Sequence, residues 1–194
     1  MDVIRSPELL SPEDSVMLVV DVQERLLPVI EGGLAVAAQI ERLLQAAGML
    51  NVPVIVSEQY PKGLGPTVAS LSRRFGEVNA PVPLEKTAFS CCGCQPLVEK
   101  LREIDRRQVI VTGIEAHVCV LQTALDFLSL GFASYVVADA VGSRRGHDKA
   151  IALRRMECAG VSPVTAESVM FEWLGSSDAD AFKAVSKLLR ETPP

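Results

Sequence analysis

Short apolar runs alternate with helical patterns along the chain, and this alternation is the feature that most limits the possible folds. The first run, Ser15–Asp21, holds an unbroken apolar stretch, as expected of a strand buried on both faces of a sheet. Further strands are predicted at 53–57, 83–86, 108–112, 134–139 and 161–164, and helices at 34–50, 95–104, 118–131, 147–159, 166–173 and 178–190. Strands that alternate with helices indicate a parallel sheet. We therefore expect an α/β fold, a doubly wound three-layer sandwich with a six-stranded parallel sheet.

The length and charge suit one globular domain. The 194 residues are enough for a well-filled core, and no repeat, low-complexity segment or linker divides them. We therefore expect a single domain over residues 1–194. The net charge of −5, without a block of Lys and Arg, argues against nucleic acid or an anionic membrane as a partner.

The chain shows no recognisable targeting signal. Met1–Ser15 lacks the basic start and the apolar run of a signal peptide, and no apolar stretch approaches the ~20 residues that cross a bilayer. The five cysteines are an odd number, which argues against a closed disulfide framework. We expect a cytoplasmic protein with free thiols.

Three chemically useful residues fall at the ends of predicted strands. Asp21 ends the first strand, Lys86 ends the third, and Cys119 follows the fourth. Because sites of open parallel sheets form at the carboxyl ends of the strands, these residues are expected to share one edge of the sheet. Taken singly, Asp21 suits a contact with a neighbouring helix start, and Lys86 suits a surface pair with Glu85. Their coincidence with a cysteine favours a catalytic site.

Cys119 is the candidate nucleophile of this site. It is predicted in the first turn of a helix, after a strand and the turn at Gly113. Unpaired N–H groups and the helix dipole stabilise a thiolate at such a place. Asp21 would take the thiol proton and later return it to a leaving group. Lys86 would hold Asp21 ionised and favour the thiolate.

The two histidines are alternative candidates. His117 lies two residues before Cys119, so a Cys–His pair is conceivable. Two side chains with that spacing at a helix entry are expected to diverge, however. His147 opens a later predicted helix, where a structural or capping role is expected.

No metal or nucleotide site is expected. Cys91, Cys92 and Cys94 form a Cys-Cys-Gly-Cys cluster, but a structural zinc needs about four ligands and the chain offers no second spaced pair. Gly113 and Gly142 follow predicted strands, yet neither belongs to a phosphate-binding glycine motif. We therefore expect no cofactor.

Four stretches together carry a resemblance to a known family: residues 20–23 (VDVQ), 86–90 (KTAFS), 112–120 (TGIEAHVCV) and 137–141 (VADAV). With them the chain resembles the isochorismatase-like cysteine hydrolases, which include nicotinamidases and N-carbamoylsarcosine amidase. The nearest branch is that of the isochorismatase domain-containing hydrolases, and the likeness covers essentially the whole chain. It implies the strand order 3-2-1-4-5-6, a catalytic triad of Asp21, Lys86 and Cys119, and a homo-oligomer, either a dimer or a tetramer.

The resemblance also implies an oxyanion hole and exposes one departure. The family has a cis peptide after the glycine turn, expected here at Ile114–Glu115, which would direct the N–H groups of Glu115 and Cys119 at the oxyanion. Nicotinamidases carry a metal-binding Asp-x-His after the second strand, where residues 57–61 of this chain are SEQYP. Because Tyr60 stands where the histidine would be, the pyridine-anchoring metal is expected to be absent, and nicotinamide is a doubtful substrate.

The expected function is hydrolysis of a small amide, or an ester, through a thioester on Cys119. Loop 59–66 is expected to cover the cleft, whose walls would include Gln23, Tyr60, Phe89 and Ile114. Gln23 would face a polar group of the substrate, whereas the two aromatic residues could instead belong to the core. Two other functions stay open: hydrolysis of a vinyl ether such as isochorismate, without covalent catalysis, and a non-catalytic binding or scaffold role.

Overall fold

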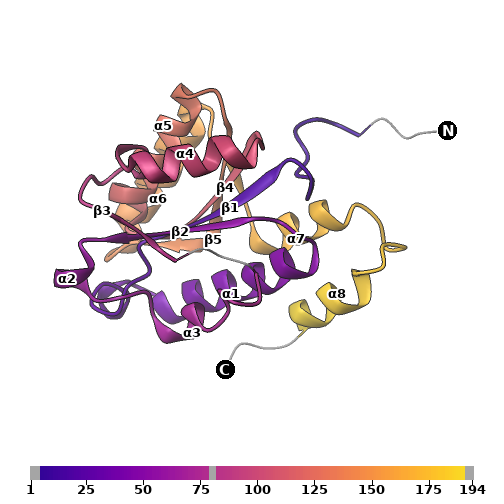
Figure 1. The fold of residues 1–194 in the computed structure, drawn as a ribbon, viewed down its shortest axis with the longest axis horizontal. Helices are drawn as coiled ribbons and strands as arrows, with labels where there is room; N and C mark the ends of the chain where they lie inside the picture. The colour runs from indigo at the N-terminus through magenta and orange to yellow at the C-terminus, as the bar shows by residue number, and fades with distance from the viewer. Residues whose placement is uncertain (1–4, 79–81, 191–194) are drawn as a thin grey trace.

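The protein is described by a computed structural model, which places residues 5–78 and 82–190 (Figure 1). Its sheet is parallel throughout, with the order β3-β2-β1-β4-β5-β6. The strands are β1 Ser15–Val20, β2 Val54–Gln59, β3 Leu84–Lys86, β4 Gln108–Ile114, β5 Ala133–Gly142 and β6 Ser162–Val164. The predicted fold class and strand order are therefore confirmed.

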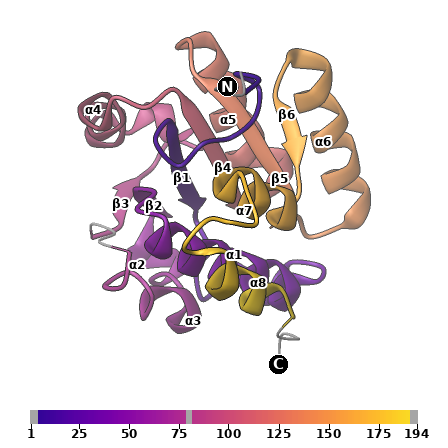
Figure 2. The same cartoon turned by 90° about the vertical axis from the view of Figure 1, so that its right-hand side faces the viewer.

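Helices cover both faces of the sheet and complete three layers (Figures 1 and 2). One face carries α1 Gly33–Met49, α7 Ala166–Leu174 and α8 Phe182–Arg190; the other carries α4 Gln95–Ile104, α5 Leu121–Ser129 and α6 Gly146–Ala159. Short turns of helix join them: η1 Leu27–Val29, α2 Pro61–Leu64, α3 Ala69–Ser72, η2 Cys91–Gly93 and η3 Ala116–Val120. Among the described residues, no helix has the length and apolar character needed to span a membrane.

The central strand β1 explains why the fold has two cores. Val16, Leu18 and Val20 pack into the layer of α4, α5 and α6. Met17 and Val19 point the other way, into the layer of α1, α7 and α8. All five side chains are fully buried, and each such burial contributes about 1.5–3 kcal/mol. An apolar run without alternation is thus the pattern of a strand covered on both faces.

Several element boundaries differ from the predicted ones; β5, for example, runs to Gly142 rather than to residue 139. The predicted loop after β2 contains α2, whose first residue is Pro61, a position where the missing N–H of proline costs nothing. Helix α8 begins at Phe182 rather than at residue 178. Asp178, which would cap a helix that begins at that point, therefore lies four residues before α8, and its backbone N–H donates to Ser176 Oγ.

Gly113 sets the distance between β1 and β4 at the carboxyl edge of the sheet. Its φ of 121° lies in a region that side chains disfavour, and a Cβ there would lie 2.1 Å from the carbonyl oxygen of Val20. Only glycine allows so close an approach of the two backbones. The residue after Val20 is Asp21, so this contact brings β4 against the strand end that carries the carboxylate.

Candidate active site

The structure brings Asp21, Lys86 and Cys119 together at the carboxyl edge of the sheet. Asp21 follows β1, Lys86 is the last residue of β3, and Cys119 lies in η3 after β4. Lys86 Nζ lies 2.7 Å from Asp21 Oδ2, and the Cys119 thiol is close enough to both charges for them to shift its pKa. Acid, ammonium and thiol are therefore grouped at one place.

Lys86 is held by acceptors and has no exposed side-chain surface. Besides Asp21, its ammonium donates to Gln59 Oε1 at 2.8 Å and to the carbonyl oxygens of Ala88 and Phe89 at 3.2 and 2.9 Å. Burial alone lowers the pKa of Lys86, but the charge of Asp21, followed by the nearby thiols, outweighs it, so the pKa is raised. Lys86 therefore stays a cation across the physiological range.

Asp21 is a fully buried carboxylate with donors on both oxygens. Ser57 Oγ donates to Oδ1 at 2.8 Å, and Lys86 Nζ donates to Oδ2 at 2.7 Å. The backbone of Asp21 has a φ of 53°, in the left-handed region that aspartate tolerates better than most residues. The chain turns there as it leaves β1. Both carboxylate oxygens are thus hydrogen-bonded inside the protein.

Cys119 is a neutral thiol in this site. It lies in η3, a single π-helical turn that directly precedes α5. Burial, reinforced by the negative charge of Asp21, raises the pKa of Cys119, and Lys86 opposes this only in part. These surroundings favour the neutral thiol rather than the expected thiolate, because desolvation and the adjacent carboxylate outweigh the ammonium. Nucleophilic attack would require Asp21 to take the proton.

The turn before Cys119 differs from the expected one. The peptide bonds of the described residues include no cis bond, so the expected cis peptide at Ile114–Glu115 is wrong. The chain turns from β4 into η3 through Glu115, whose φ and ψ are 13° and 89°. The Glu115 carboxylate accepts two hydrogen bonds from Arg144, at 2.8 and 3.1 Å, which ties this turn to the loop after β5.

His117 also contacts the loop after β5. Its Nδ1 lies 3.0 Å from Ser143 Oγ, so the ring is directed at Ser143, which follows the end of β5. His147 is the second residue of α6. Neither position gives a histidine a contact with the acid, ammonium or thiol described above.

The residues predicted to line the cleft occupy different environments. Gln23 is fully buried, and its amide is engaged by the backbone: Nε2 donates to the carbonyl oxygens of Gln59 and Gly65, and Oε1 accepts from Gln59 N. It ties loop 59–66 to the strand end rather than facing a substrate group. Ile114 is fully buried, whereas Tyr60 and Phe89 are 56% and 55% exposed. Neither aromatic side chain belongs to the core.

Two polar residues of the site were missed by the sequence analysis. Gln59 accepts from Lys86 Nζ at 2.8 Å and donates to the Thr87 carbonyl oxygen at 2.8 Å. Ser57 donates to Asp21. Both lie in the carboxyl half of β2, so the rule that located Asp21 also applied to them. Their position next to the triad was the signal that could have found them.

Residues 57–61, at the end of β2, do not fit the pyridine-anchoring metal of nicotinamidases. Glu58 Oε1 accepts two hydrogen bonds from Thr67, from N at 2.6 Å and from Oγ1 at 2.7 Å, and Tyr60 has no metal-binding group suited to replace a histidine. Within residues 5–78 and 82–190, no group of three or more His, Cys, Asp or Glu side chains is arranged to hold a metal ion.

The Cys91–Cys94 cluster does not converge on one point. Cys91 Sγ lies 3.4 Å from Ser57 Oγ, on the triad side of the turn. Cys94 Sγ lies 3.6 Å from the carbonyl oxygen of Glu85, and Cys92 is near Ser90. All three are free thiols, and each faces a different neighbour.

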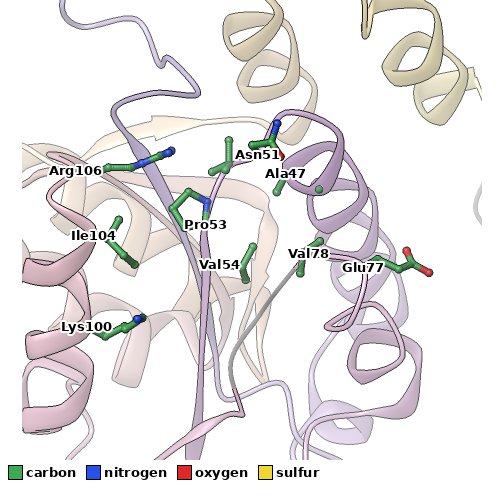
Figure 3. Close-up of a pocket in the computed structure, with 11 residues that line it drawn as sticks. Ala47, Asn51, Pro53, Val54, Glu77, Val78, Lys100, Ile104 and Arg106 are labelled. Atoms are coloured by element: carbon green, nitrogen blue, oxygen red, sulfur yellow. The ribbon is translucent and has the colours of Figure 1, made fainter.

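A cavity of about 420 Å³ lies at the opposite, amino-terminal edge of the sheet (Figure 3). It is bounded by the end of α1, the start of β2 and α4, with Asn51, Pro53, Val54, Lys100, Ile104 and Arg106 among its lining residues. A smaller cavity of about 380 Å³ adjoins β3 at Tyr60, Thr87 and Cys94. It touches Lys86 only through backbone, because that side chain is fully buried.

A doubly wound parallel sheet with an acid, an ammonium and a thiol grouped at its carboxyl edge defines a class of α/β proteins equipped for nucleophilic chemistry. Comparison with known proteins identifies the class. The family model described as the isochorismatase domain matches residues 15–168, and the chain belongs to the isochorismatase family. Its fold is that of the family's hydrolases.

Relatives and solved structures agree with this assignment. The chain is 40% identical to "Isochorismatase domain-containing protein 2" of Danio rerio, over 95% of this chain and 91% of that protein. The structure of MAR1 ribonuclease from Caenorhabditis elegans is 41% identical, with a TM-score of 0.89 over 96% of this chain and 94% of that one.

Two structures of YcaC are also similar. YcaC from Pseudomonas aeruginosa, with hexane-2,5-diol and covalent acrylamide, is 25% identical, with a TM-score of 0.85 over 95% of this chain and 93% of that one. YcaC from Escherichia coli, described as an octameric hydrolase of unknown specificity, is also 25% identical. Its TM-score is 0.87 over 96% of this chain and 91% of that one.

Proposed function

We propose that the protein hydrolyses a small amide, or an ester, through a thioester on Cys119. The observation that carries the proposal is the buried Asp21–Lys86 pair, 2.7 Å apart, at the edge of the sheet where Cys119 lies close enough for both charges to shift the pKa of its thiol. For a neutral thiol, the buried carboxylate is a nearby proton acceptor. The fixed cation compensates the negative charge that forms when the thiol loses its proton.

The proposed reaction has two halves. Asp21 takes the proton of Cys119 as the sulfur bonds to the substrate carbonyl carbon, and the carbonyl oxygen becomes an oxyanion. The C–N bond then breaks, and Asp21 gives its proton to the departing amine, which leaves the acyl group on sulfur. Water attacks the thioester, Asp21 takes one of its protons, and the C–S bond breaks. The acid is released and the thiol regains its proton.

Lys86 and the turn at Glu115 have supporting roles in this proposal. Before the first step, the ammonium of Lys86 keeps Asp21 charged. When the proton has moved to the carboxylate, the ammonium compensates the negative charge that forms on the sulfur and then on the oxyanion. The backbone N–H groups of Glu115 and Cys119 are the proposed oxyanion donors; because the Ile114–Glu115 peptide is not cis, we propose that the turn through Glu115 directs them instead. No metal takes part, in keeping with the side chains at the end of β2.

The related YcaC structures support covalent chemistry and self-association. Pseudomonas aeruginosa YcaC contains covalent acrylamide, which is a small amide and an electrophile. Escherichia coli YcaC is octameric, and we propose a homo-oligomer here as well, without a fixed number of subunits. We further propose that the protein acts in the cytoplasm on a small molecule.

The other candidate comes from the name of the Caenorhabditis elegans relative, a ribonuclease that is 41% identical. The net charge of −5 gives no electrostatic attraction to a polyanion. RNA therefore belongs in the substrate screen as a competing outcome. So does a vinyl ether such as isochorismate, whose hydrolysis would need the carboxyl group but not the thiol.

The test is a parallel screen of small amides, esters, isochorismate and RNA against the wild type and Cys119→Ala. We expect amide or ester turnover by the wild type, no turnover by Cys119→Ala, and an acyl adduct on Cys119 in mass spectra of a stalled reaction. Near-normal turnover of any substrate by Cys119→Ala would reject the thioester mechanism. An adduct found only on Cys91, Cys92 or Cys94 would reject the assignment of the nucleophile.

A further inference from the structure

A second buried thiol, that of Cys91, is linked to Asp21 through Ser57, and the proposed reaction gives it no role. Cys91 is fully buried in η2, and its Sγ lies 3.4 Å from Ser57 Oγ. Ser57, also fully buried in β2, donates in turn to Asp21 Oδ1 at 2.8 Å. Thiol, hydroxyl and carboxylate thus form a continuous chain that crosses from η2 through β2 to the end of β1.

We propose that Cys91 is a positioning residue for Asp21, which acts through Ser57 as a hydrogen-bond relay with a fixed direction. The Ser57 hydroxyl has one proton, and the charged carboxylate is the stronger of its two possible acceptors. Its oxygen is then left to accept the thiol proton of Cys91. The relay therefore runs from Cys91 to Ser57 to Asp21, and it presents a constant donor to Oδ1.

Two observations fix the direction of the relay. Burial raises the pKa of Cys91 to about 12, and the charge of Asp21 adds to this effect, so the thiol keeps its proton at any physiological pH. The backbone of Cys91 is also held in place, because Cys91 N donates to Thr123 Oγ1 of α5 at 2.9 Å. Because Cys91 neither ionises nor moves, its hydrogen bond to Ser57 keeps the same direction while Asp21 exchanges a proton with Cys119.

The relay would set how readily Asp21 accepts and releases a proton. The titratable groups that face Asp21, in the described part of the chain, are Lys86 from β3, Cys119 from η3 and Cys91 from η2. Lys86 and the relay favour the carboxylate, whereas Cys119 delivers a proton to it. When Asp21 becomes protonated it is a weaker acceptor for Ser57, and the relay then favours release of the proton to the leaving amine.

This inference rests on the proposed role of Asp21 as proton acceptor, and it can be tested without a known substrate. The probe is iodoacetamide, and the measurement is the rate of Cys119 alkylation from about pH 4 to pH 9, followed by mass spectrometry. Proton transfer to Asp21 should give a pH-independent plateau whose acidic edge reports the ionisation of Asp21. The variants are Ser57→Ala, Cys91→Ala and Cys91→Ser, with Cys92→Ala as the matched control from the same turn.

We expect Ser57→Ala to move the acidic edge upward by about one pH unit, because one hydrogen bond to the carboxylate is lost. Cys91→Ala should move it in the same direction by a smaller amount. Cys91→Ser should keep the wild-type edge, since a hydroxyl also donates, and Cys92→Ala should leave it unchanged. An edge that is the same in Cys91→Ala, Cys92→Ala and wild type would overturn the relay, and so would a shift in Cys91→Ser equal to that in Cys91→Ala.

A spectroscopic readout separates hydrogen bonding from packing. The S–H stretching band of Cys91, identified by its loss in Cys91→Ala, should move toward the frequency of a free thiol in Ser57→Ala. An unmoved band would show that the thiol does not donate to Ser57. A plateau without any amide or ester turnover would reject the proposed function and keep the relay. Turnover that depends on Cys119, with an unmoved acidic edge in Ser57→Ala and Cys91→Ala, would support the proposed function and reject the relay.

Discussion

Lys86 Nζ lies 2.7 Å from Asp21 Oδ2, and neither side chain has any exposed surface. The two residues are far apart in sequence and reach each other because β3 and β1 end at the same edge of the sheet, with only β2 between them. A buried pair of this kind gains Coulomb energy but loses hydration, so its net contribution to stability is small. Removal of one partner is different, because it leaves an unpaired charge in the interior.

Replacement of Lys86 should therefore cost much more than replacement of both partners. We expect Lys86→Met to lower the free energy of unfolding by about 3–5 kcal/mol. Asp21→Asn combined with Lys86→Met should recover part of that loss, while both variants stay inactive. Urea unfolding measures the free energies, and Lys100→Met, which breaks an exposed pair with Glu103, is the control and should cost less than about 1 kcal/mol. Equal losses in the single and double variants would contradict the buried charge as the cause.

The reactivity of Cys119 should depend on Asp21 in a way that simple thiolate chemistry does not. In the wild type, burial and the carboxylate raise the pKa of Cys119, so alkylation should proceed mainly by proton transfer to Asp21 and show a plateau. Asp21→Asn removes both the acceptor and the negative charge. The plateau should vanish, and the rate should follow one thiol titration at a lower pH than that of the wild-type thiol. Iodoacetamide kinetics at a series of pH values measure this, and a plateau that persists in Asp21→Asn would exclude Asp21 as the acceptor.

Stability should fall in alkaline solution because of the buried thiols. Burial raises the pKa of Cys91 from 9.0 to about 12, and the pKa of Cys119 is also raised. In both cases the folded state favours the neutral thiol. This contribution is complete below about pH 9 and is lost as the pH rises toward the folded-state pKa, by up to roughly 1.4 kcal/mol per pH unit for each thiol.

Urea unfolding between about pH 8 and pH 11 tests this dependence. Cys91→Ser removes one of the groups that titrate in this range, so its free energy of unfolding should decline less steeply than that of the wild type. Cys158 is exposed, and Cys158→Ser should decline in parallel with the wild type. Parallel curves for Cys91→Ser as well would mean that Cys91 titrates alike in the folded and unfolded states.

The family resemblance implied the sheet order, whereas the sequence pattern alone was sufficient to predict the strand ends of the site. Parallel strands share one carboxyl edge, so the positions of Asp21 and Lys86 at the ends of apolar runs already place them on it. The sequence could not predict side-chain contacts between different elements, because these depend on rotamers. Ser57 and Cys91 meet only because η2 folds back over β2, and no spacing in the chain signals that contact.

The protonation state of Cys119 was mispredicted because the sequence reveals a helix start but not the loss of water around it. Desolvation and the nearby charge of Asp21 are properties of the packed site, and they act against the thiolate. The role of Gln23 was mispredicted for a similar reason, because it depends on the packed structure. Its place near Asp21 was evident, but its partners, the backbone of Gln59 and Gly65, depend on the path of the loop.

Gly113 should tolerate no side chain. A Cβ there would lie 2.1 Å from Val20 O and 2.6 Å from Val20 N, both of them backbone atoms that cannot move aside. We expect Gly113→Ala to lower the free energy of unfolding by more than ~3 kcal/mol, since it adds overpacking to an unfavourable φ. Gly76→Ala is the control, because no atom lies within 4 Å of a Cβ at that position. Circular dichroism melts give the comparison, and a Gly113→Ala protein as stable as Gly76→Ala would contradict the close contact of β1 and β4.

Activity should survive exhaustive removal of divalent metal ions. Where nicotinamidases carry a metal-binding Asp-x-His, Ser57 donates its hydroxyl to Asp21 and Glu58 is engaged by Thr67. Tyr60 is 56% exposed and offers no imidazole nitrogen. We therefore expect dialysis against EDTA or phenanthroline to leave the turnover of the best amide or ester substrate within about twofold of the untreated enzyme, since a required metal would give a far larger loss.

Metal analysis of the purified protein should find less than one equivalent. A nicotinamidase treated in parallel is the control for the chelation itself. Loss of activity that zinc or another divalent ion restores would overturn both the metal-free mechanism and the interpretation of Tyr60.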